Sequence, residues 1–456
     1  MNIQQIVQNQ RNFFNTHATK DLDTREKALR NILKWIQTNE NLICEALKKD
    51  LNKSDTEAYM CEIGMTLSEL RDQLKHFRKW SKPHKVKTPL AQFYGTSFEL
   101  AEPYGVVLVM SPWNYPFMLT MAPAVGAIAA GNTVVIKPSA YAPNTSHVIK
   151  KMIDETCQEE HVCVVEGGRA ENTALLEQRF DYIFFTGSVD VGKLVMEKAS
   201  RYLTPVTLEL GGKSPCIIDE HVDLKVATKR IAFGKYLNAG QTCVAVDYVL
   251  CHESHVENFI KELKNVVNEF FGNDPLACEH LVKIINPKHF ERLNNLIENE
   301  NIVLGGKNDE IRNRIEPTAL LLKDDLSPIM QEEIFGPILP IIPYKTLDDA
   351  IQIIHKKEKP LAFYLFTNDS NTEKKCLKEI SFGGGCINDT IIHLASNELG
   401  FGGVGYSGMG SYHGKKSFNT FSHIRSIVKK ATWIDLPMRY YPFNEMKKKM
   451  IKMFMK

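Results

Sequence analysis

From Pro103 to Ile136 the chain carries no charged residue, and this stretch constrains the fold more than any other. Six residues that bend or end helices divide it: Pro112, Asn114, Pro116, Pro123, Gly126 and Gly131. A membrane-spanning helix needs ~20 continuous apolar residues, so we do not expect the stretch to cross a bilayer. We expect a strand at Val106–Met110, a helix near Leu119–Ala129 and a strand at Thr133–Lys137. All three are apolar on every side, which is typical of the buried centre of an α/β layer.

The same alternation of short apolar strands and helical patterns continues along the chain. It runs from 103 to about 207, and a second series runs from about 208 to 395. Such alternation favours mostly parallel sheets covered by helices on both faces. Residues 1–80 show helical spacing of apolar residues, and the proline-containing segment 82–102 suits an extended hairpin. The sequence therefore predicts two α/β units with a helical N-terminal region and a hairpin.

Composition excludes several classes of protein. The 456 residues are enough for two or three domains. A formal net charge of +2 gives no overall electrostatic signature for binding nucleic acid or an anionic membrane. The ten cysteines form no C-x-x-C pair, so we expect neither a disulfide framework nor a metal site, and a reducing cytoplasm is favoured. The N-terminal MNIQQIVQNQRNFF has no apolar core and does not resemble a signal peptide.

The segment FFTGSVDVGKLV is close to the phosphate-binding loop of an NTPase. Such a loop ends in Gly-Lys-Ser/Thr because the hydroxyl binds magnesium, and here Leu194 follows Lys193, which disfavours an NTPase. A strand that ends at Gly187 before a helix also suits a pyrophosphate, because helix N-termini expose unpaired N–H groups and Ser188 can donate. Since the fingerprint G-x-G-x-x-G is missing, a tight turn without any ligand fits this segment equally well.

Three further stretches place polar groups where chemistry is plausible. In NAGQTCVA, Cys243 follows small and polar residues, and a loop or helix start there would lower the thiol pKa; most lone cysteines are instead buried and inert. In VTLELGGKSP, Glu209 lies in an apolar strand. An unpaired buried charge is costly, so Glu209 is either paired with a cation or a general base whose pKa burial raises. QEEIFGPILP places two carboxylates before a Gly-Pro turn.

Together these stretches resemble the aldehyde dehydrogenase superfamily. The resemblance rests on seven motifs in the family's order: SPWNYPF, IKPSA, FFTGS, LELGGKSP, NAGQTC, EEIFGP and FGGVGYSGMG. The short N-terminus and the spacing resemble the class 3 branch, which includes fatty and aromatic aldehyde dehydrogenases. The implied fold is α/β, with a Rossmann-like dinucleotide-binding domain (1–81 and 103–207), an α/β catalytic domain (208–395) and a small β oligomerisation arm with the C-terminal segment (82–102 and 396–456).

The resemblance also implies the chemistry. Cys243 attacks the aldehyde as a thiolate, and the Asn114 amide and the Cys243 backbone N–H hold the oxyanion. Hydride leaves to a nicotinamide, and a water activated by Glu209 hydrolyses the resulting thioester to the carboxylic acid. Glu333 has also been considered as a base in class 3 relatives. Two alternatives remain. One is a non-catalytic family member that acts as a binding or structural protein, although this chain keeps all three catalytic residues. The other is the disfavoured NTPase.

The cofactor implied by the resemblance is NAD. Its expected contacts are Lys137, Ser139, Gly187, Ser188, Gly192, Leu210, Glu333 and Phe335. Lys137 is expected at the adenine-side ribose, Ser188 at the pyrophosphate, Glu333 at the nicotinamide ribose and Phe335 beside the nicotinamide. The family often has a glutamate after KPS, where this chain has Ala140. A carboxylate there repels a 2′-phosphate and alanine does not, so the sequence predicts that NADP is tolerated beside NAD.

The sequence constrains the substrate, the oligomeric state and the role of the C-terminal tail less tightly than the reaction. Six aromatic, methionine or aliphatic elements are expected near the substrate entry: Tyr115, Phe117, Met118, Met121, Tyr236 and the loop at 391–394. Such a lining favours apolar aldehydes of medium or long chain, aromatic or isoprenoid type. A class 3 relative is expected to be a homodimer whose arm also protects a sheet edge. The basic, Met-rich tail PMRYYPFNEMKKKMIKMFMK fits a packed or frayed helix, which we favour, or a weak membrane-surface contact.

Overall fold

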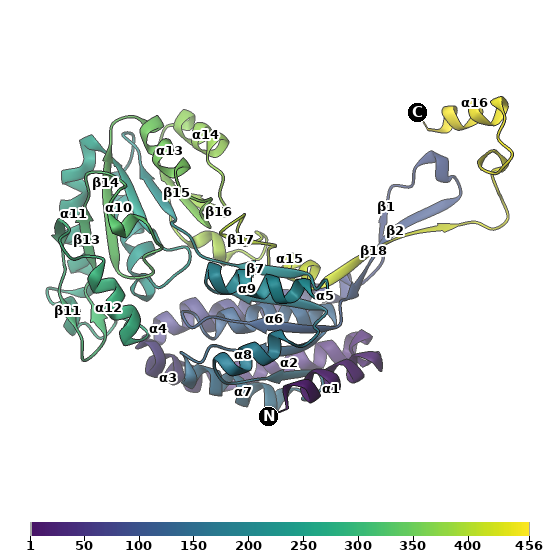
Figure 1. Ribbon diagram of the computed structural model, residues 1–456, viewed down its shortest axis with the longest axis horizontal. Coiled ribbons are helices and arrows are strands. Elements are labelled where there is room, and N and C mark those ends of the chain that lie inside the picture. The colour runs from purple at the N-terminus through teal and green to yellow at the C-terminus, as the bar shows by residue number, and fades with distance from the viewer. Residues whose placement is uncertain (1, 456) are drawn as a thin grey trace.

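The computed structural model describes residues 2–455 as a body of two α/β units from which a long arm projects (Figure 1). Residues 3–80 are mostly helical, as predicted. Their helices are α1 (Ile3–Asn15), α2 (Leu22–Thr38), α3 (Glu40–Leu51), α4 (Asp55–Ala58) and α5 (Gly64–Trp80). Asp21 starts α2 by accepting the N–H of Thr24. One π-helical segment, Tyr59–Ile63, joins α4 to α5.

The first unit is built on a six-stranded sheet of order β17-β7-β6-β3-β4-β5. Its strands are β3 (Val106–Met110), β4 (Thr133–Lys137), β5 (Val162–Val164), β6 (Tyr182–Thr186), β7 (Val206–Glu209) and β17 (Gly408–Met409). All are parallel except β17, which runs antiparallel to β7. Every residue of β3, β4 and β6 is buried, which explains why these strands are apolar on both faces.

Helix α6 (Met118–Ala130) is the apolar helix expected between β3 and β4, and all its residues are buried. Gly126 lets it approach α15 (Lys415–Thr420), since an added Cβ would lie 2.7 Å from Ser417 Cβ. The helix ends at Gly131, whose φ of +98° favours glycine. Three further helices belong to this unit: α7 (Pro143–Thr156), α8 (Arg169–Leu176) and α9 (Val189–Ser200).

The second unit is built on a seven-stranded sheet of order β10-β13-β14-β9-β8-β15-β16. Its strands are β8 (Pro215–Ile218), β9 (Tyr248–His252), β10 (Ile302–Leu304), β13 (Thr318–Leu321), β14 (Ile338–Tyr344), β15 (Ala362–Phe366) and β16 (Gly384–Ile387). Only β10 is antiparallel to its neighbour. The helices of this unit are α10 (Leu224–Tyr236), α11 (Val256–Phe271), α12 (Pro287–Asn295), α13 (Leu347–His355) and α14 (Ser370–Glu379). A short ribbon, β11 (Asn308–Asp309) and β12 (Arg314–Ile315), completes it.

The arm is a three-stranded antiparallel sheet of order β1-β2-β18, made of β1 (His84–Val86), β2 (Gly95–Pro103) and β18 (Ser422–Lys430). The hairpin expected at 82–102 is therefore confirmed. Figure 1 shows that the chain continues from β18 to α16 (Glu445–Phe454) at the far end of the arm. None of the residues of α16 is buried.

The structure differs from the expected division of the chain in the segment that follows residue 395. We expected 396–456 to accompany the arm, but β17 pairs with β7, and α15 packs on α5 and α6 in the body. The glycine-rich backbone of 400–414 returns to the sheet, and only the chain from β18 onward joins the arm. Among the described residues, no helix is both long and apolar enough to span a bilayer.

Candidate active site

A cleft of about 640 Å³ lies between the two units, at the carboxyl ends of β3, β6 and β7. Ligands of open parallel sheets bind at this edge. Nine residues expected from the sequence to serve the site line it: Asn114, Ser139, Gly187, Ser188, Glu209, Leu210, Cys243, Glu333 and Phe335. The sheet topology therefore brings together motifs that are more than two hundred residues apart.

Two expected cofactor residues, Lys137 and Gly192, do not line the cleft. The Lys137 ammonium is buried and donates to the carbonyls of Pro138 and Gly167, each at 2.7 Å. Burial lowers the pKa of Lys137 to about 8. Gly192 lies beneath the cleft, where a Cβ would come within 2.7 Å of Leu210 Cδ2. Its absent side chain allows α9 to pack against β7.

Glu209 ends β7 and is buried, with Thr186 of β6 and Gly408 of β17 as its register partners. Neither carboxylate oxygen has a hydrogen-bond partner within residues 2–455. Burial without a compensating cation raises the pKa of Glu209 well above its ordinary value. Of the two explanations open from the sequence, the structure therefore favours a poised acid–base group over a structural ion pair.

Glu333 is a second carboxylate in the wall of the cleft. Burial, followed by the nearby Asp247 carboxylate, raises the pKa of Glu333 to about 8. The Glu333 carboxylate lies directly over Gly211, where a Cβ would come within 2.1 Å of Glu333 Oε2 and displace the carboxylate. The neighbouring Phe335 has a φ of +50° and meets Trp113 edge-on.

Cys243 lies in a turn after the 3-10 segment Leu237–Gly240, with no helix starting at the thiol. We expected its setting to lower the thiol pKa, and this prediction is wrong for the structure. Burial, followed by the charges of Glu333 and Glu209, raises the pKa of Cys243 to about 12. Both carboxylates oppose a thiolate, so the thiol proton needs an acceptor when sulfur attacks.

Asn114 is buried and fixed against the cysteine loop. Its Nδ2 donates to the carbonyl of Gln241 at 3.0 Å, which commits one of its two amide hydrogens. Its Oδ1 has no partner in the part of the chain that the structure describes. Next to it, the Tyr115 hydroxyl contacts Thr242 Oγ1 at 2.6 Å. The amide is thus anchored beside the thiol but keeps one hydrogen for another acceptor.

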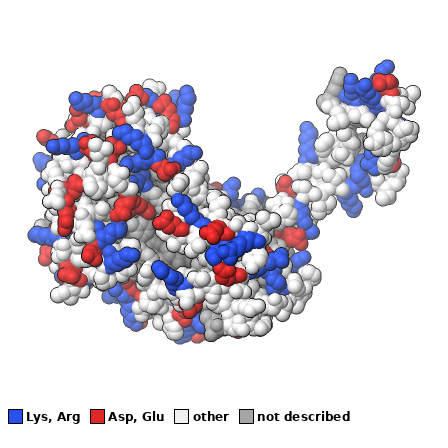
Figure 2. Space-filling model, viewed as in Figure 1, with Lys and Arg blue, Asp and Glu red and all other residues white. Residues whose placement is uncertain are grey.

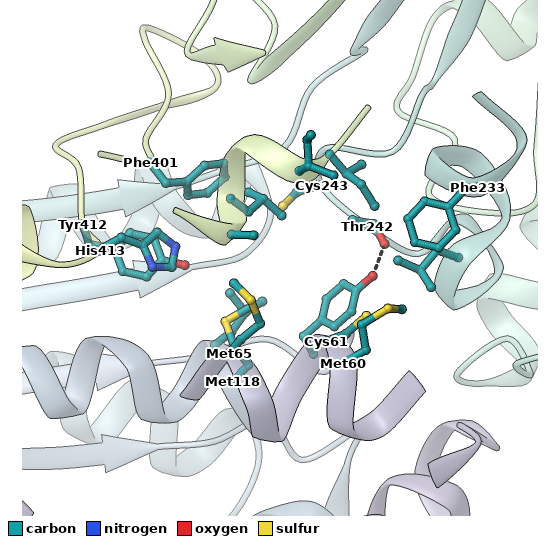
Figure 3. Close-up of a pocket in the computed structure, with 17 residues that line it drawn as sticks. Met60, Cys61, Met65, Met118, Phe233, Thr242, Cys243, Phe401, Tyr412 and His413 are labelled. Atoms are coloured by element: carbon teal, nitrogen blue, oxygen red, sulfur yellow. Dashed lines mark hydrogen bonds between the residues drawn. The ribbon is translucent and has the colours of Figure 1, made fainter. Parts of the chain in front are cut away.

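A second, apolar cavity of about 190 Å³ reaches Cys243 from the other side (Figure 3). Sulfur and aromatic groups dominate its wall, and Figure 3 shows Met65 and Met118 together across the cavity from Cys243. Of the residues expected at the substrate entry, Tyr115, Met118 and the loop at 391–394 contribute to it. Phe117, Met121 and Tyr236 are instead buried core residues.

Sequence inspection missed most of this wall, eleven of its seventeen residues. The missed residues are Met60, Cys61, Met65, Leu119, Phe233, Leu237, Thr242, Ala395, Phe401, Tyr412 and His413. They come from the π-helical segment, α5, α6, α10, the cysteine loop at 237–242, the 3-10 segment Ile392–Ala395 and the glycine-rich segment. Two signals were available in the sequence: Thr242 precedes Cys243, and Phe401, Tyr412 and His413 lie within the glycine-rich stretch 400–414.

The protein-family description "Aldehyde dehydrogenase family" matches residues 1–427. The chain belongs to the aldehyde dehydrogenase family. It is 49% identical over its whole length to a 4,4′-diaponeurosporen-aldehyde dehydrogenase of Staphylococcus aureus, of which it covers 99%. It is 44% identical to the dimeric NADP-preferring aldehyde dehydrogenase of Rattus norvegicus, over 94% of this chain and 95% of the relative.

A solved structure, the substrate-bound state of Staphylococcus aureus AldH, superimposes with a TM-score of 0.98 at 48% identity and full coverage of both chains. The protein is thus an NAD(P)-dependent aldehyde dehydrogenase that oxidises an aldehyde to the carboxylic acid. The predicted family, α/β fold and reaction are confirmed, and the NTPase alternative is excluded.

The cleft of this aldehyde dehydrogenase fits a dinucleotide. Its volume lies in the range of cofactor sites. Ser188 is the N-cap residue of α9, and its side chain makes no capping hydrogen bond. The N-terminus of such a helix exposes N–H groups that can bind a pyrophosphate. Thr186 Oγ1 and Glu333 Oε1 are likewise buried and unpaired within the described chain. No group of three potential metal ligands occurs in residues 2–455.

Proposed function

We propose that this aldehyde dehydrogenase oxidises apolar aldehydes of medium or long chain, aromatic or isoprenoid type, with Cys243 as nucleophile. One observation carries the proposal: Cys243 lies in the wall of both the apolar cavity and the polar cleft. A tail in the cavity would bring its aldehyde carbon to the sulfur, while a nicotinamide would approach from the cleft. The relative's name, a diaponeurosporen-aldehyde dehydrogenase, supports an isoprenoid-type substrate.

The chain's own groups supply the acid–base chemistry. Glu209 accepts the thiol proton, directly or through water, as sulfur attacks the carbonyl carbon. Its raised pKa makes the ionised form a strong base, and the raised pKa of Cys243 makes such a base necessary. The free hydrogen of the Asn114 amide and the Cys243 backbone N–H stabilise the oxyanion. Glu209 must pass the thiol proton to solvent before the second half of the reaction. It then removes a proton from the water that cleaves the thioester, and it returns this proton to the departing thiolate, which releases the acid and restores the thiol.

The bound dinucleotide would supply the hydride acceptor. Ser188 and the N-terminus of α9 would hold its pyrophosphate, and Lys137, which keeps one ammonium hydrogen uncommitted to Pro138 and Gly167, would bind the adenine-side ribose. Glu333 would bind the nicotinamide ribose, and Phe335 would flank the nicotinamide. Gly187 lies against the Phe185 ring, because a Cβ there would come within 2.5 Å of Phe185 Cζ. Ala140 is exposed and leaves NADP acceptable beside NAD.

The test is NAD(P)H formation at 340 nm with aldehydes of increasing chain length. Cys243→Ala is expected to lose turnover by at least about 10⁴-fold, because nucleophile removal leaves only binding and oxyanion stabilisation. Cys61→Ala is a matched control, since this thiol lines the same cavity. Equal activity of Cys243→Ala and Cys61→Ala would refute the nucleophile. A preference for short or charged aldehydes would refute the apolar substrate class.

We also propose a homodimer. The arm leaves Val86, Phe93 and Val428 exposed, and the face of α9 leaves Val191, Leu194 and Met196 exposed. Apolar surface of this kind is typical of an interface between copies. A monomer by light scattering at micromolar concentration would contradict the homodimer.

The ten free thiols are consistent with the cytoplasm as the location of the protein.

The tail supports a weak peripheral contact with an anionic membrane. Met446, Met450 and Met453 follow helical spacing on α16 and are exposed, while Lys448 and Lys452 lie on another face. Figure 2 shows basic side chains gathered at the end of the arm, whereas both signs mix over the body. The triple Met→Ser variant should co-sediment less with phosphatidylglycerol vesicles than wild type. Equal co-sedimentation with phosphatidylcholine vesicles, or no loss in the variant, would contradict the contact.

A further inference from the structure

A buried ion pair lies behind the catalytic loop, and the reaction as described above does not use it. Lys53 Nζ contacts Glu62 Oε1 at 2.5 Å, and both side chains are completely buried. Lys53 follows α3, and Glu62 belongs to the π-helical segment Tyr59–Ile63. Burying two charges is expensive, and a well-packed apolar pair is often as stable. Stability alone therefore does not explain this ion pair, and the other groups that Lys53 and Glu62 bind indicate what it does.

Both partners bind the segment that carries Asn114. Lys53 Nζ donates to the Asn114 carbonyl at 3.0 Å and lies 4.1 Å from the centre of the Tyr115 ring. Glu62 Oε2 accepts the N–H groups of Phe117 and Met118, at 2.8 and 3.2 Å, where α6 begins. The pair thus holds this short segment at both ends. An apolar replacement could fill the same volume but could neither donate to the carbonyl nor accept the two N–H groups.

The same region also holds the cysteine loop. Asn238 Nδ2 donates both to the Asn114 carbonyl at 2.9 Å and to the Gln241 carbonyl at 3.0 Å. Asn238 is in the left-handed region with φ of +54°, and Glu57 Oε1 accepts its N–H at 3.0 Å. The Asn114 carbonyl is therefore the point where Lys53 and the cysteine loop meet. A shift at this carbonyl changes the distance between the Asn114 amide and Cys243.

We propose that Lys53 and Glu62 are positioning residues that set the Asn114 amide against Cys243 for oxyanion stabilisation. This inference rests on the oxyanion role proposed for Asn114. Donors must sit where the oxyanion forms, and displacements of about 1 Å cost up to ~100-fold in rate. The charges are retained because they fix the loop at its carbonyl and N–H groups, while contacting neither the aldehyde cavity nor the cleft.

The experiment compares Lys53→Met with Arg25→Met in the full-length enzyme. Arg25 is a matched control, because it is also a buried cation that donates to backbone carbonyls, those of Thr19 and Ala129, away from the site. The readouts are kcat and KM for aldehyde oxidation, cofactor-free hydrolysis of p-nitrophenyl acetate, and Tm. Lys53→Met should lower kcat of both reactions by roughly tenfold to a hundredfold with KM changed less than about twofold. Arg25→Met should lower Tm without changing kcat.

A double-mutant cycle decides whether Lys53 acts through Asn114. In an Asn114→Ala background, Lys53→Met should cause no further loss of kcat, because the donor it positions is gone. The same loss in both backgrounds would overturn the positioning role, and so would an equal loss of kcat in Arg25→Met at equal Tm. Unchanged ester hydrolysis in Asn114→Ala alone would instead refute the oxyanion role itself, so the two failures are distinguishable.

A second variant tests the proposal even if Lys53→Met folds poorly. Lys53→Met with Glu62→Gln removes both charges, leaves no uncompensated ion, and keeps an amide oxygen for the N–H groups of Phe117 and Met118. Tm should recover while kcat stays low, because no group donates from position 53 to the Asn114 carbonyl. Recovery of kcat together with Tm would show a structural role and overturn the proposal.

Discussion

The cleft and the apolar cavity share Cys243 but are built in opposite ways. The cleft takes many of its residues from the ends of parallel strands and the turns that follow them, and others from α9 and α12. It contains polar and titratable groups such as Ser188, Glu209 and Glu333. The cavity takes its residues from helices and irregular segments, and its wall is mainly sulfur, aromatic and aliphatic carbon. One side suits a charged, hydrogen-bonding ligand, and the other suits an apolar chain.

Because the walls of the cleft and the cavity differ, substitutions in them should change different properties of the enzyme. Substitutions in the cavity should change the aldehyde preferred while the KM for the dinucleotide stays the same. Substitutions in the cleft should change the acid–base chemistry and the dinucleotide preference while the chain-length profile stays the same. Cys243 belongs to both walls, so its loss should affect every substrate equally.

The largest effect in the cleft is expected for Glu209→Gln. Without the base, removal of the thiol proton and hydrolysis of the thioester should both slow, so kcat should fall by on the order of 10²–10⁴-fold. Because the pKa of Glu209 is raised, its ionised fraction and kcat should increase with pH in wild type. Glu209→Gln should lack this increase.

Glu333→Gln is the matched control for Glu209→Gln, since both carboxylates line the cleft. A larger loss of thioester hydrolysis in Glu333→Gln would transfer the base role to Glu333. A chain-length profile altered by either variant would contradict the separation of the two walls.

Filling the cavity should have the next largest effect. Met65→Phe narrows the wall opposite Cys243 and should lower kcat/KM for long-chain aldehydes by roughly 10–200-fold, the discrimination an apolar pocket gives for small changes in fit. Short-chain aldehydes and the KM for NAD should change little. Met450→Phe, on the exposed tail helix, is the control. Equal losses for short and long aldehydes would show that the cavity does not bind the chain.

The contrast between the walls also explains what could be predicted from the sequence. Parallel strands end at one edge of a sheet, so FFTGS and LELGGKSP end side by side, and Gly187, Ser188 and Glu209, which the family resemblance implied for the site, line one cleft. Met60 and Phe233 carry no such signal, because their meeting depends on how whole helices pack. The predicted lowering of the Cys243 thiol pKa was wrong for a related reason. It depends on burial and on Glu333, ninety residues away, and neither is visible in NAGQTC.

Stability should respond to the titration of Glu333. The pKa of Glu333 is about 8 in the folded chain, above the ordinary 4.5, so between these values the folded state keeps a proton that the unfolded chain has lost. Unfolding free energy therefore falls as pH rises through this window. In cofactor-free enzyme at pH 8.5, Glu333→Gln should be more stable than wild type by up to roughly 5 kcal/mol, since the pKa changes from 4.5 to about 8 and each pKa unit corresponds to about 1.4 kcal/mol.

Urea unfolding at pH 5 and pH 8.5 measures this gain. Glu332→Gln is the control, because Glu332 is exposed and pairs with Arg292 at the surface. The stabilisation should vanish at pH 5, where Glu333 keeps its proton in the folded state. A gain of the same size at both pH values would exclude titration of Glu333 as its cause.

The smallest effect is expected at the far end of the cleft, at Ala140. Ala140 is exposed beside Ser139 and Tyr141, which line the cleft. Ala140→Glu places a carboxylate where it would repel a 2′-phosphate and accept hydrogen bonds from a ribose, so the ratio of kcat/KM with NAD to that with NADP should rise roughly tenfold, about 1.4 kcal/mol. Ala140→Gln controls for size. Because Ala140 is remote from the cavity, the preferred aldehyde should not change. Equal rejection of NADP by wild type and Ala140→Glu would show that discrimination lies elsewhere in the cleft.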